Sequence, residues 1–218
     1  MDYADTTVII PVKDEPATGK VAAEVLRALP GASVIVIYKG SLNMRSRPKN
    51  VRIIRQPDSG KGNAVRRAAR EVKTELMCLI DGDSTYSALD LKRLVLLVRN
   101  GADMAVGNRL DNMDPGAMPV YIVLGNRVLS ITANLLYGTN IKDSQTGLRV
   151  IRKKVFDSLR VCEPGFGIEE EINIKAGKAN CKIVEAPIMY RKRTGESKQM
   201  KLPDGIRLLL INFKFLFS

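Results

Sequence analysis

The chain has 218 residues, 45% of them hydrophobic and 27% charged, a balance typical of a soluble α/β domain and not of a disordered segment. Its formal charge of +12 points to an anionic partner, which could be a nucleic acid, an anionic membrane surface or a phosphorylated small molecule. Because the chain contains no histidine, triads with an imidazole base and histidine-based metal sites are excluded, and a bound metal must have oxygen ligands.

Two further features indicate a cytoplasmic protein. Cys78, Cys162 and Cys181 are too few and too scattered for a disulfide framework or a zinc site, so we expect reduced residues of the core. Asp2 and Asp5 interrupt the N-terminus, and no apolar run of a signal peptide follows them.

Strands and helices are expected to alternate through the first half of the chain. Short apolar and β-branched runs predict strands at residues 7–12, 33–38, 51–55, 75–81 and 102–107. Apolar residues recur at helical spacing between these runs. Ser87 followed by Asp90 has the spacing of a capping box at the start of one helix. This order predicts a doubly wound, parallel sheet that binds ligands at the carboxyl ends of its strands.

The second half of the chain is less regular. It contains a long apolar helix pattern at 120–138, a strand at 148–153, a helix at 168–178 and a strand at 182–193. The long apolar helix fits a core position or the path of a lipid chain equally well. No repeat or linker divides the sequence, so we expect one domain over residues 1–202, followed by a tail of residues 203–218.

The tail is expected to form an amphipathic helix. Ile206, Leu209, Leu210, Phe213 and Phe217 share one face at helical spacing, whereas Arg207 and Lys214 lie elsewhere. Such a helix lies in a membrane interface or docks on the protein core, and both alternatives fit the pattern.

Two carboxylates, Asp81 and Asp83, stand at the end of the apolar strand 75–81. Side chains at positions i and i+2 of an extended segment point the same way, so both can converge on one point. Converging carboxylates repel each other unless a cation lies between them, and hard oxygen ligands favour Mg²⁺ or Mn²⁺, which complete their shells with phosphates. Gly82 leaves room for a sugar to approach the backbone. The alternative interpretation is a simple polar turn.

Six segments resemble, in order, those of the family 2 glycosyltransferases, and within that family those of dolichyl-phosphate mannose synthases and related polyprenyl-phosphate glycosyltransferases. They are VIIPVKDE (8–15), GKGNAVRRA (60–68), LIDGDSTYS (79–87), GNRL (107–110), DSQTGLRV (143–150) and EAPIMYRKRTGESK (185–198). The resemblance implies a GT-A fold, which is a single α/β domain with a mostly parallel central sheet. It also implies an Asp-x-Asp pair that holds Mg²⁺ or Mn²⁺ with the donor diphosphate, and inversion at the anomeric carbon.

The resemblance assigns roles to individual residues. Asp81 lies nearer the nucleotide, and Asp83 coordinates the metal with Thr85 nearby. The donor-binding set is Pro11, Asp14, Glu15, Lys61, Asp81, Gly82, Asp83 and Ser197. The basic residues that approach phosphates are Arg109, Arg127, Arg193 and Lys198, with Lys192 as an alternative to Arg193. Tyr38, Lys39 and Gly40 stand where the family has a pair of aspartates, which leaves the nucleotide open.

The expected function is transfer of a hexose from a nucleotide sugar, of the GDP-mannose or UDP-glucose type, to a polyprenyl or dolichyl phosphate at the cytoplasmic face of a membrane. A phosphate acceptor arrives ionised and is its own nucleophile, so this reaction needs no catalytic histidine. It needs charge stabilisation, which a metal and basic side chains provide.

Two alternatives remain. The same fold could transfer the sugar to a hydroxyl of a glycolipid or polysaccharide, in which case one of Glu169, Glu170 and Glu171 could be the base. Otherwise these carboxylates offset the dipole of their helix. A basic nucleic-acid-binding protein is the alternative from another class, but aromatic residues make up only 5% of the chain and no recognition motif is found.

Overall fold

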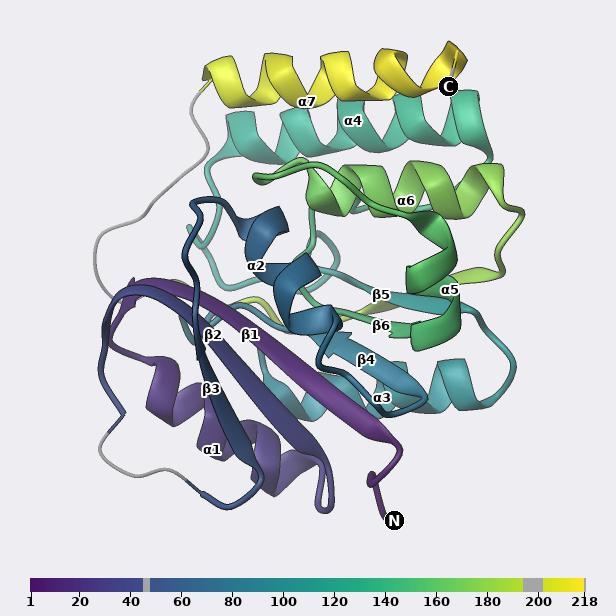
Figure 1. The fold of residues 1–218 in the computed structure, drawn as a ribbon. Coiled ribbons are helices and arrows are strands. Elements are labelled where there is room, and N and C mark those ends of the chain that lie inside the picture. Colours follow the sequence, from purple (N-terminus) through teal and green to yellow (C-terminus); the bar gives the residue numbers. More distant parts are fainter. Residues whose placement is uncertain (45–47, 194–201, 218) are drawn as a thin grey trace.

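The computed structural model describes residues 1–44, 48–193 and 202–217. Over these residues the chain forms a seven-stranded sheet in the order β3-β2-β1-β4-β6-β5-β7 (Figure 1). The strands are β1 (Thr6–Glu15), β2 (Ser33–Leu42), β3 (Val51–Arg55), β4 (Leu76–Leu79), β5 (Met104–Asn108), β6 (Arg149–Arg152) and β7 (Ile183–Pro187). β6 runs antiparallel to β4 and β5, and the other neighbouring strands are parallel. The expected mostly parallel α/β domain is confirmed.

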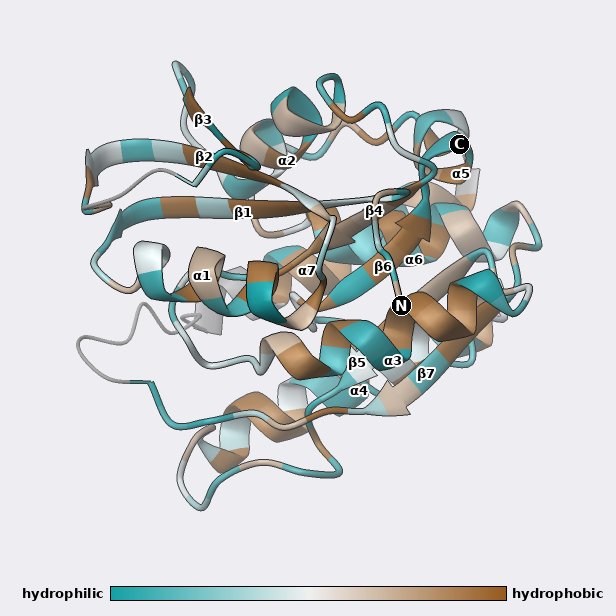
Figure 2. Ribbon diagram, turned by 90° about the horizontal axis from the view of Figure 1, so that it is seen from below, coloured by the Kyte–Doolittle hydropathy of each residue, from teal (hydrophilic) through white to brown (hydrophobic). Residues whose placement is uncertain are grey.

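Helices cover both faces of the sheet. They are α1 (Thr18–Ala28), α2 (Lys61–Ala69), α3 (Ala88–Arg99), α4 (Val120–Tyr137), α5 (Lys153–Leu159), α6 (Ile168–Lys178) and α7 (Leu202–Lys214), followed by a 3-10 turn at Phe215–Phe217. Helices α1 and α3 pack into one apolar cluster with the sheet, and α2, α5 and α6 pack into a second on the opposite face. Figure 2 shows hydrophobic and hydrophilic residues on both α1 and α3, as expected for helices with one buried face.

Most predicted elements are confirmed, with differences at their ends. The strand expected at 75–81 ends at Leu79, so Asp81 and Asp83 lie in the turn beyond it. Helix α5 was not expected, because its seven residues are too few for a clear helical period. Ser87 is the N-cap of α3 as predicted, but the capping box is wrong. Asp90 Oδ2 instead accepts a hydrogen bond of 3.0 Å from the Met189 amide, which ties α3 to the segment after β7.

Among the cysteines, only Cys78 lies in the core as expected. Cys181 is half-buried and Cys162 is exposed, so the expectation of a core position is wrong for Cys162. Each of the three has a free thiol.

Helices α4 and α7 form an outer layer over α6 (Figure 1). Leu208, Ile211 and Phe215 are buried there against Leu129 of α4 and Ile174 of α6. The opposite side of α7 is exposed at Ile206, Leu210 and Phe213, three members of the predicted stripe, whereas the side chain of Phe217 lies outside the description. The tail helix therefore docks on the core through one face and exposes three residues of the predicted stripe, whereas Leu209 of that stripe packs, partly buried, against the cluster.

Helix α4, which packs beside α7, also exposes apolar residues. Its exposed large apolar residues are Val120, Tyr121, Leu124, Val128, Ile131 and Leu135. We call these residues, together with Ile206, Leu210, Phe213 and Leu216, the outer apolar face. Among the described residues, α4 is also the one helix long and apolar enough to cross a membrane, a property that core helices of soluble proteins share.

Candidate active site

A cavity of about 510 Å³ opens at the carboxyl ends of β1 and β4. The end of β1 contributes Pro11 and Glu15, the turn after β4 contributes Asp81, Gly82 and Asp83, and the start of α2 contributes Lys61. This position is where a sheet of parallel strands is expected to bind ligands. Its size lies within the range of about 300–1,000 Å³ that is usual for small-molecule sites.

Asp81 is paired with a half-buried lysine. Lys61 Nζ lies 2.5 Å from Asp81 Oδ1 and 2.7 Å from Glu169 Oε1. Burial alone would lower the pKa of Lys61, but the charges of Asp81 and Glu169 outweigh it and raise the pKa well above its ordinary value. Gly147 approaches the same carboxylate so closely that a Cβ there would lie 2.3 Å from Asp81 Oδ2. A side chain at position 147 would therefore displace the Asp81 carboxylate from its present position.

Asp83 is held by its own turn and by an arginine. Its Oδ1 accepts hydrogen bonds from the backbone amide of Thr85 at 3.1 Å and from the Thr85 hydroxyl at 2.6 Å. Its Oδ2 lies 3.3 Å from Arg193 Nη1, and Arg193 Nη2 also contacts Glu15 Oε2 at 2.5 Å. Thr85 therefore orients the carboxylate, and its hydroxyl is already used for that purpose.

The two aspartates face one cavity but are neutralised by different cations. Among the described residues, no three side chains of the metal-ligating types converge. A divalent ion at this place would thus need ligands from a bound diphosphate, which is how Mg²⁺ is commonly held. Gly82 lines the cavity, and a Cβ there would lie 2.3 Å from Val12 Cγ1 of β1, which is a further reason for glycine besides the predicted one.

Arg109 lines the cavity but is committed to a buried ion pair. Its Nε and Nη2 each lie 2.7 Å from an oxygen of Asp143. The aromatic residues beside its guanidinium are Tyr86 and Tyr190. Burial would lower the pKa of Arg109, but Asp143 raises it further above its usual range. Only Nη1, which is 3.5 Å from the Tyr86 hydroxyl, remains for a ligand.

The structure brings most of the predicted residues to the cavity. Its lining includes Pro11, Glu15, Lys61, Asp81, Gly82, Asp83, Arg109 and Arg193. Asp14 does not line it, because its Oδ1 accepts hydrogen bonds from the amide and hydroxyl of Ser41. Thr85 is buried behind Asp83, and Arg127 is exposed on α4, one position beyond the cavity residue Asn126. Ser197 and Lys198 lie outside the described residues.

Several lining residues were not foreseen as site residues. The polar ones include Gln56, Asn126, Gln145 and Tyr190. Ala117, Met118, Pro119, Ile122 and Phe166 make one wall of the cavity apolar. Because this wall includes the start of α4, the apolar helix predicted at 120–138 was the feature of the sequence that could have indicated it.

The three successive glutamates of α6 lie in different environments. Glu169 reaches the cavity and Lys61. Glu170 is fully buried beneath α7, where it accepts hydrogen bonds from Asn212 and Gln145. Glu171 accepts the backbone amides of Cys162 and Glu163, and pairs with Lys175 at 2.8 Å. Compensation of the helix dipole, the role expected for all three, therefore does not account for the separate contacts that each glutamate makes.

The sequence matches the family model described as Glycosyl transferase family 2 over residues 7–160. Among curated proteins, it is 34% identical over 178 residues to the low-salt glycan biosynthesis hexosyltransferase Agl6 of Haloferax volcanii, with 78% of this chain and 43% of that protein covered. This chain thus spans less than half the length of that relative. It is 29% identical over 188 residues to a dolichyl-phosphate hexose transferase of Haloferax volcanii, with coverage of 85% and 82%.

A solved structure supports the fold assignment. The chain resembles glucosyl-3-phosphoglycerate synthase of Mycobacterium tuberculosis, crystallised with Mn²⁺, UDP and phosphoglyceric acid, with a TM-score of 0.72. The match covers 95% of this chain and 78% of that protein at 18% sequence identity. At this identity the likeness concerns the fold.

Proposed function

The chain belongs to glycosyl transferase family 2, and from that premise we propose that it transfers a hexose from a nucleotide sugar to a polyprenyl or dolichyl phosphate, with inversion at the anomeric carbon. In support, one Haloferax relative is named as a dolichyl-phosphate hexose transferase. The mycobacterial synthase was crystallised with Mn²⁺ and UDP. The nucleotide of this chain's donor is left to experiment.

One observation carries the choice of a lipid phosphate as acceptor. The cavity joins a charged half, with Lys61, Arg109 and Arg193, to the apolar wall at the start of α4. That wall leads to the outer apolar face, since Val120, Tyr121 and Leu124 of the same helix are exposed. An acceptor with a phosphate head and a hydrocarbon tail matches both halves, because the phosphate meets the basic side chains and the tail meets the apolar wall.

The reaction follows from these residues. A phosphate oxygen of the acceptor forms a bond to the anomeric carbon of the sugar, while the bond from that carbon to the donor diphosphate breaks and its electron pair stays on the diphosphate. Mg²⁺ or Mn²⁺ held at Asp83, with Asp81 beside it, would neutralise charge on that leaving group. Lys61 and Arg193 add positive charge around the phosphates, which lets two anions approach each other.

Glu169 is a poor candidate for the base that a hydroxyl acceptor requires. Lys61 Nζ lies 2.7 Å from Glu169 Oε1, so this carboxylate is already committed to an ion pair at the cavity. Transfer to a hydroxyl is therefore the less favoured candidate, and the test below includes it.

The proposed function is tested by transfer assays. The protein is incubated with Mn²⁺ and either GDP-mannose or UDP-glucose, and with dolichyl phosphate or dolichol as acceptor. We expect a lipid-linked sugar from dolichyl phosphate with one of the donors, and none after chelation of the metal with EDTA. Product from dolichol alone would overturn the phosphate acceptor and leave the glycosyltransferase assignment in place.

We also propose that the outer apolar face contacts the membrane that holds the acceptor, on the cytoplasmic side. Monomeric soluble proteins rarely expose contiguous apolar areas of this kind. The net charge of +12 and the exposed Arg207 favour an anionic lipid surface. This placement brings the apolar wall of the cavity to the depth at which a lipid phosphate lies.

Replacing Leu135 and Leu210 together by aspartate is expected to lower binding to vesicles that contain anionic lipid at least tenfold. Both side chains are among the most exposed of the outer apolar face, at 81% and 62%, and each leucine contributes about 1.5–3 kcal/mol when it leaves water completely. Co-sedimentation measures the bound fraction. Leu89→Asp on α3 is the matched control, since Leu89 is 65% exposed on another surface. Equal losses in both variants would contradict the proposal.

A further inference from the structure

Two amide side chains in the cavity wall carry acceptor atoms that no described protein group uses. Asn126 is 1% exposed, and its carbonyl oxygen is buried without a hydrogen-bond partner in the described part of the chain. The amide nitrogen of Gln145 donates hydrogen bonds to Glu170 Oε2 at 2.5 Å and to Ser144 Oγ at 3.3 Å. Its carbonyl oxygen accepts no hydrogen bond from a described residue. Both residues line the cavity. Acceptors left in such a wall are available to the hydroxyl donors of a ligand.

Glu170 is held rigidly behind Gln145. This carboxylate is fully buried, and its Oε1 accepts a hydrogen bond of 2.8 Å from Asn212 Nδ2 of α7. The backbone carbonyl of Asn212 in turn accepts a hydrogen bond from the Tyr137 hydroxyl at the end of α4. Glu170 is thereby fixed between α7 on one side and Gln145 on the other.

The chemistry of a carboxylate sets the sense of the Gln145 amide. An ionised carboxylate only accepts hydrogen bonds, so the NH₂ group of Gln145 must face Glu170. The carbonyl oxygen of Gln145 is then turned away from Glu170 and toward the cavity. Gln145 lines the same cavity as Asp81 and Asp83, and Gly147, two residues further on, lies against Asp81.

We propose that Gln145 binds a hydroxyl group of the transferred sugar through its carbonyl oxygen, and that Glu170 is the positioning residue that sets this sense of the amide. Asn126 supplies a second acceptor in the same wall. The proposal rests on the proposed function, because a sugar attached to a diphosphate at the two aspartates would lie beside this wall. The ligand class is a hexose that presents hydroxyl donors to two amide oxygens.

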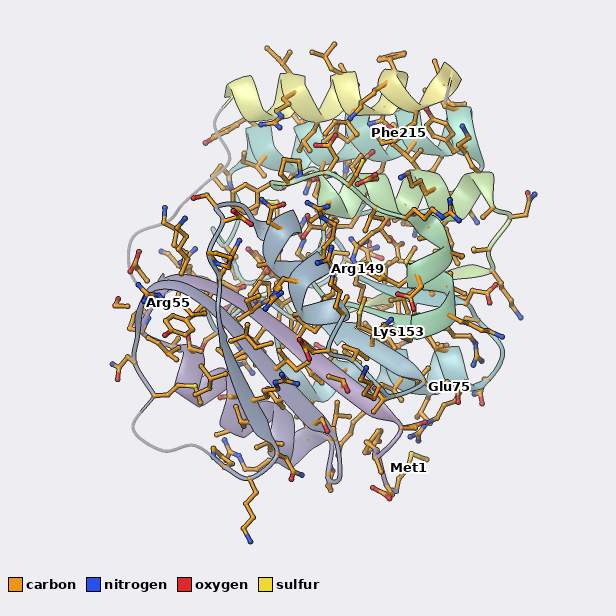
Figure 3. All side chains as sticks on the ribbon, viewed as in Figure 1. Met1, Arg55, Glu75, Arg149, Lys153 and Phe215 are labelled. Atoms are coloured by element: carbon orange, nitrogen blue, oxygen red, sulfur yellow. The ribbon has the colours of Figure 1, made fainter. Side chains whose placement is uncertain are left out.

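Among the described residues, the ionisable side chains that interact with Glu170 are Arg149 of β6 and Tyr137 of α4. Arg149 is fully buried on the α6 side of the sheet (Figure 3), where it donates to the Glu169 carbonyl and to Asn173. Burial raises the pKa of Glu170 to about 7, and the hydrogen bonds from Asn212, Ser144 and Gln145, with the charge of Arg149, oppose this rise. Once protonated, Glu170 can also donate, and the Gln145 amide is no longer held in one sense.

Binding measurements separate sugar recognition from nucleotide recognition. Calorimetry with Mn²⁺ compares GDP-mannose with GDP and UDP-glucose with UDP for the parent and for Gln145→Met, Glu170→Met and Glu170→Gln. In each variant we expect the affinity for the nucleotide sugar that the parent binds to fall about five- to tenfold, the worth of one hydrogen bond. The affinity for the sugar-free nucleotide should stay within twofold. Glu171→Gln is the matched control, since this neighbouring carboxylate is also fully buried but contacts Cys162, Glu163 and Lys175 and does not line the cavity.

The pH dependence supplies a measurement that a purely structural role would not change. In the parent, the preference for the nucleotide sugar over the free nucleotide should fall as the pH is lowered from 8 to 6, and Glu170→Gln should show no such change. The stability of the folded protein should change with pH in the opposite direction from its preference for the nucleotide sugar. Because the pKa of Glu170 is higher in the folded than in the unfolded protein, the folded state loses stability as the pH rises from the unfolded-state pKa toward about 7. Glu170→Gln should therefore melt at a higher temperature than the parent at pH 8, but not at pH 5.

Each outcome decides between the proposals. Loss of sugar affinity in a variant that is as stable as the parent, or more stable, supports the positioning role. Retention of full affinity for the nucleotide sugar in Gln145→Met and Glu170→Gln overturns it, while nucleotide binding leaves the proposed function intact. Failure of the parent to bind any of the four nucleotides with Mn²⁺ overturns both.

Discussion

Replacing Asp83 by asparagine is expected to lower kcat/KM for sugar transfer at least a thousandfold. The amide oxygen of asparagine can still accept the two hydrogen bonds from Thr85, so the turn keeps its shape. What is lost is the negative charge at Oδ2, the oxygen that faces Arg193 and the cavity. A thousandfold loss corresponds to about 4 kcal/mol of transition-state stabilisation, which is the order expected for a metal on a leaving diphosphate.

Binding of Mn²⁺ to the same variant, measured by electron paramagnetic resonance in the presence of a nucleoside diphosphate, should weaken in parallel with the rate. Asp14→Asn is the matched control, because Asp14 is an aspartate close to the cavity that does not line it. Its amide oxygen can still accept from Ser41, and we expect its activity within threefold of the parent. Near-normal turnover of Asp83→Asn would show that this carboxylate does not hold the metal.

Replacing Lys61 by methionine is expected to destabilise the protein and also to remove donor binding. The change leaves Asp81 and Glu169 facing each other without the cation that lies 2.5 Å and 2.7 Å from them. Breaking a buried ion pair by removing one partner typically costs about 3–5 kcal/mol. Chemical denaturation should therefore show a loss of this order in the free energy of unfolding at pH 7.

Two further variants identify the cause of that loss. Lys39→Met removes a lysine that also lines the cavity but whose Nζ contacts Ser59 Oγ at 2.7 Å and no carboxylate of the described residues, so we expect a change in stability below about 1 kcal/mol. Adding Glu169→Gln to Lys61→Met removes one unpaired charge and should restore part of the stability. A single variant as stable as the parent would mean that Lys61 does not neutralise the two carboxylates.

The sequence predicted the centre of the site because its signal is local. Asp81 and Asp83 directly follow an apolar strand, and the carboxyl end of such a strand is where ligands bind. Pro11 and Glu15, which the family resemblance implied, also line the cavity, and their position at the end of β1 agrees with the same rule. The alternation of strands and helices likewise predicted the mostly parallel sheet and nearly all of its strands.

The rest of the site depends on which face a residue presents and on contacts between distant segments. Arg127 was expected in the site, but a single step along a helix turns a side chain by about 100°, and Asn126 is the residue that faces the cavity. Gln145 and Glu170 meet across 25 positions of the sequence, and only the packing of α6 against the segment before β6 brings them together. The spacing of residues along the chain does not predict such a contact.

The direction of β6 determines where this protein can accept insertions. Because β6 is antiparallel to β4, the residues that enter β6, including Gly147, meet the carboxyl end of β4 at Asp81, while the far end of β6 meets Glu75 and Leu76 at the opposite edge of the sheet. An added residue between Asn140 and Leu148 would reshape the cavity at once. A longer connection between α2 and β4, at residues 71–75, would only extend the opposite rim, so related chains should vary in length there and keep the segment before β6 constant.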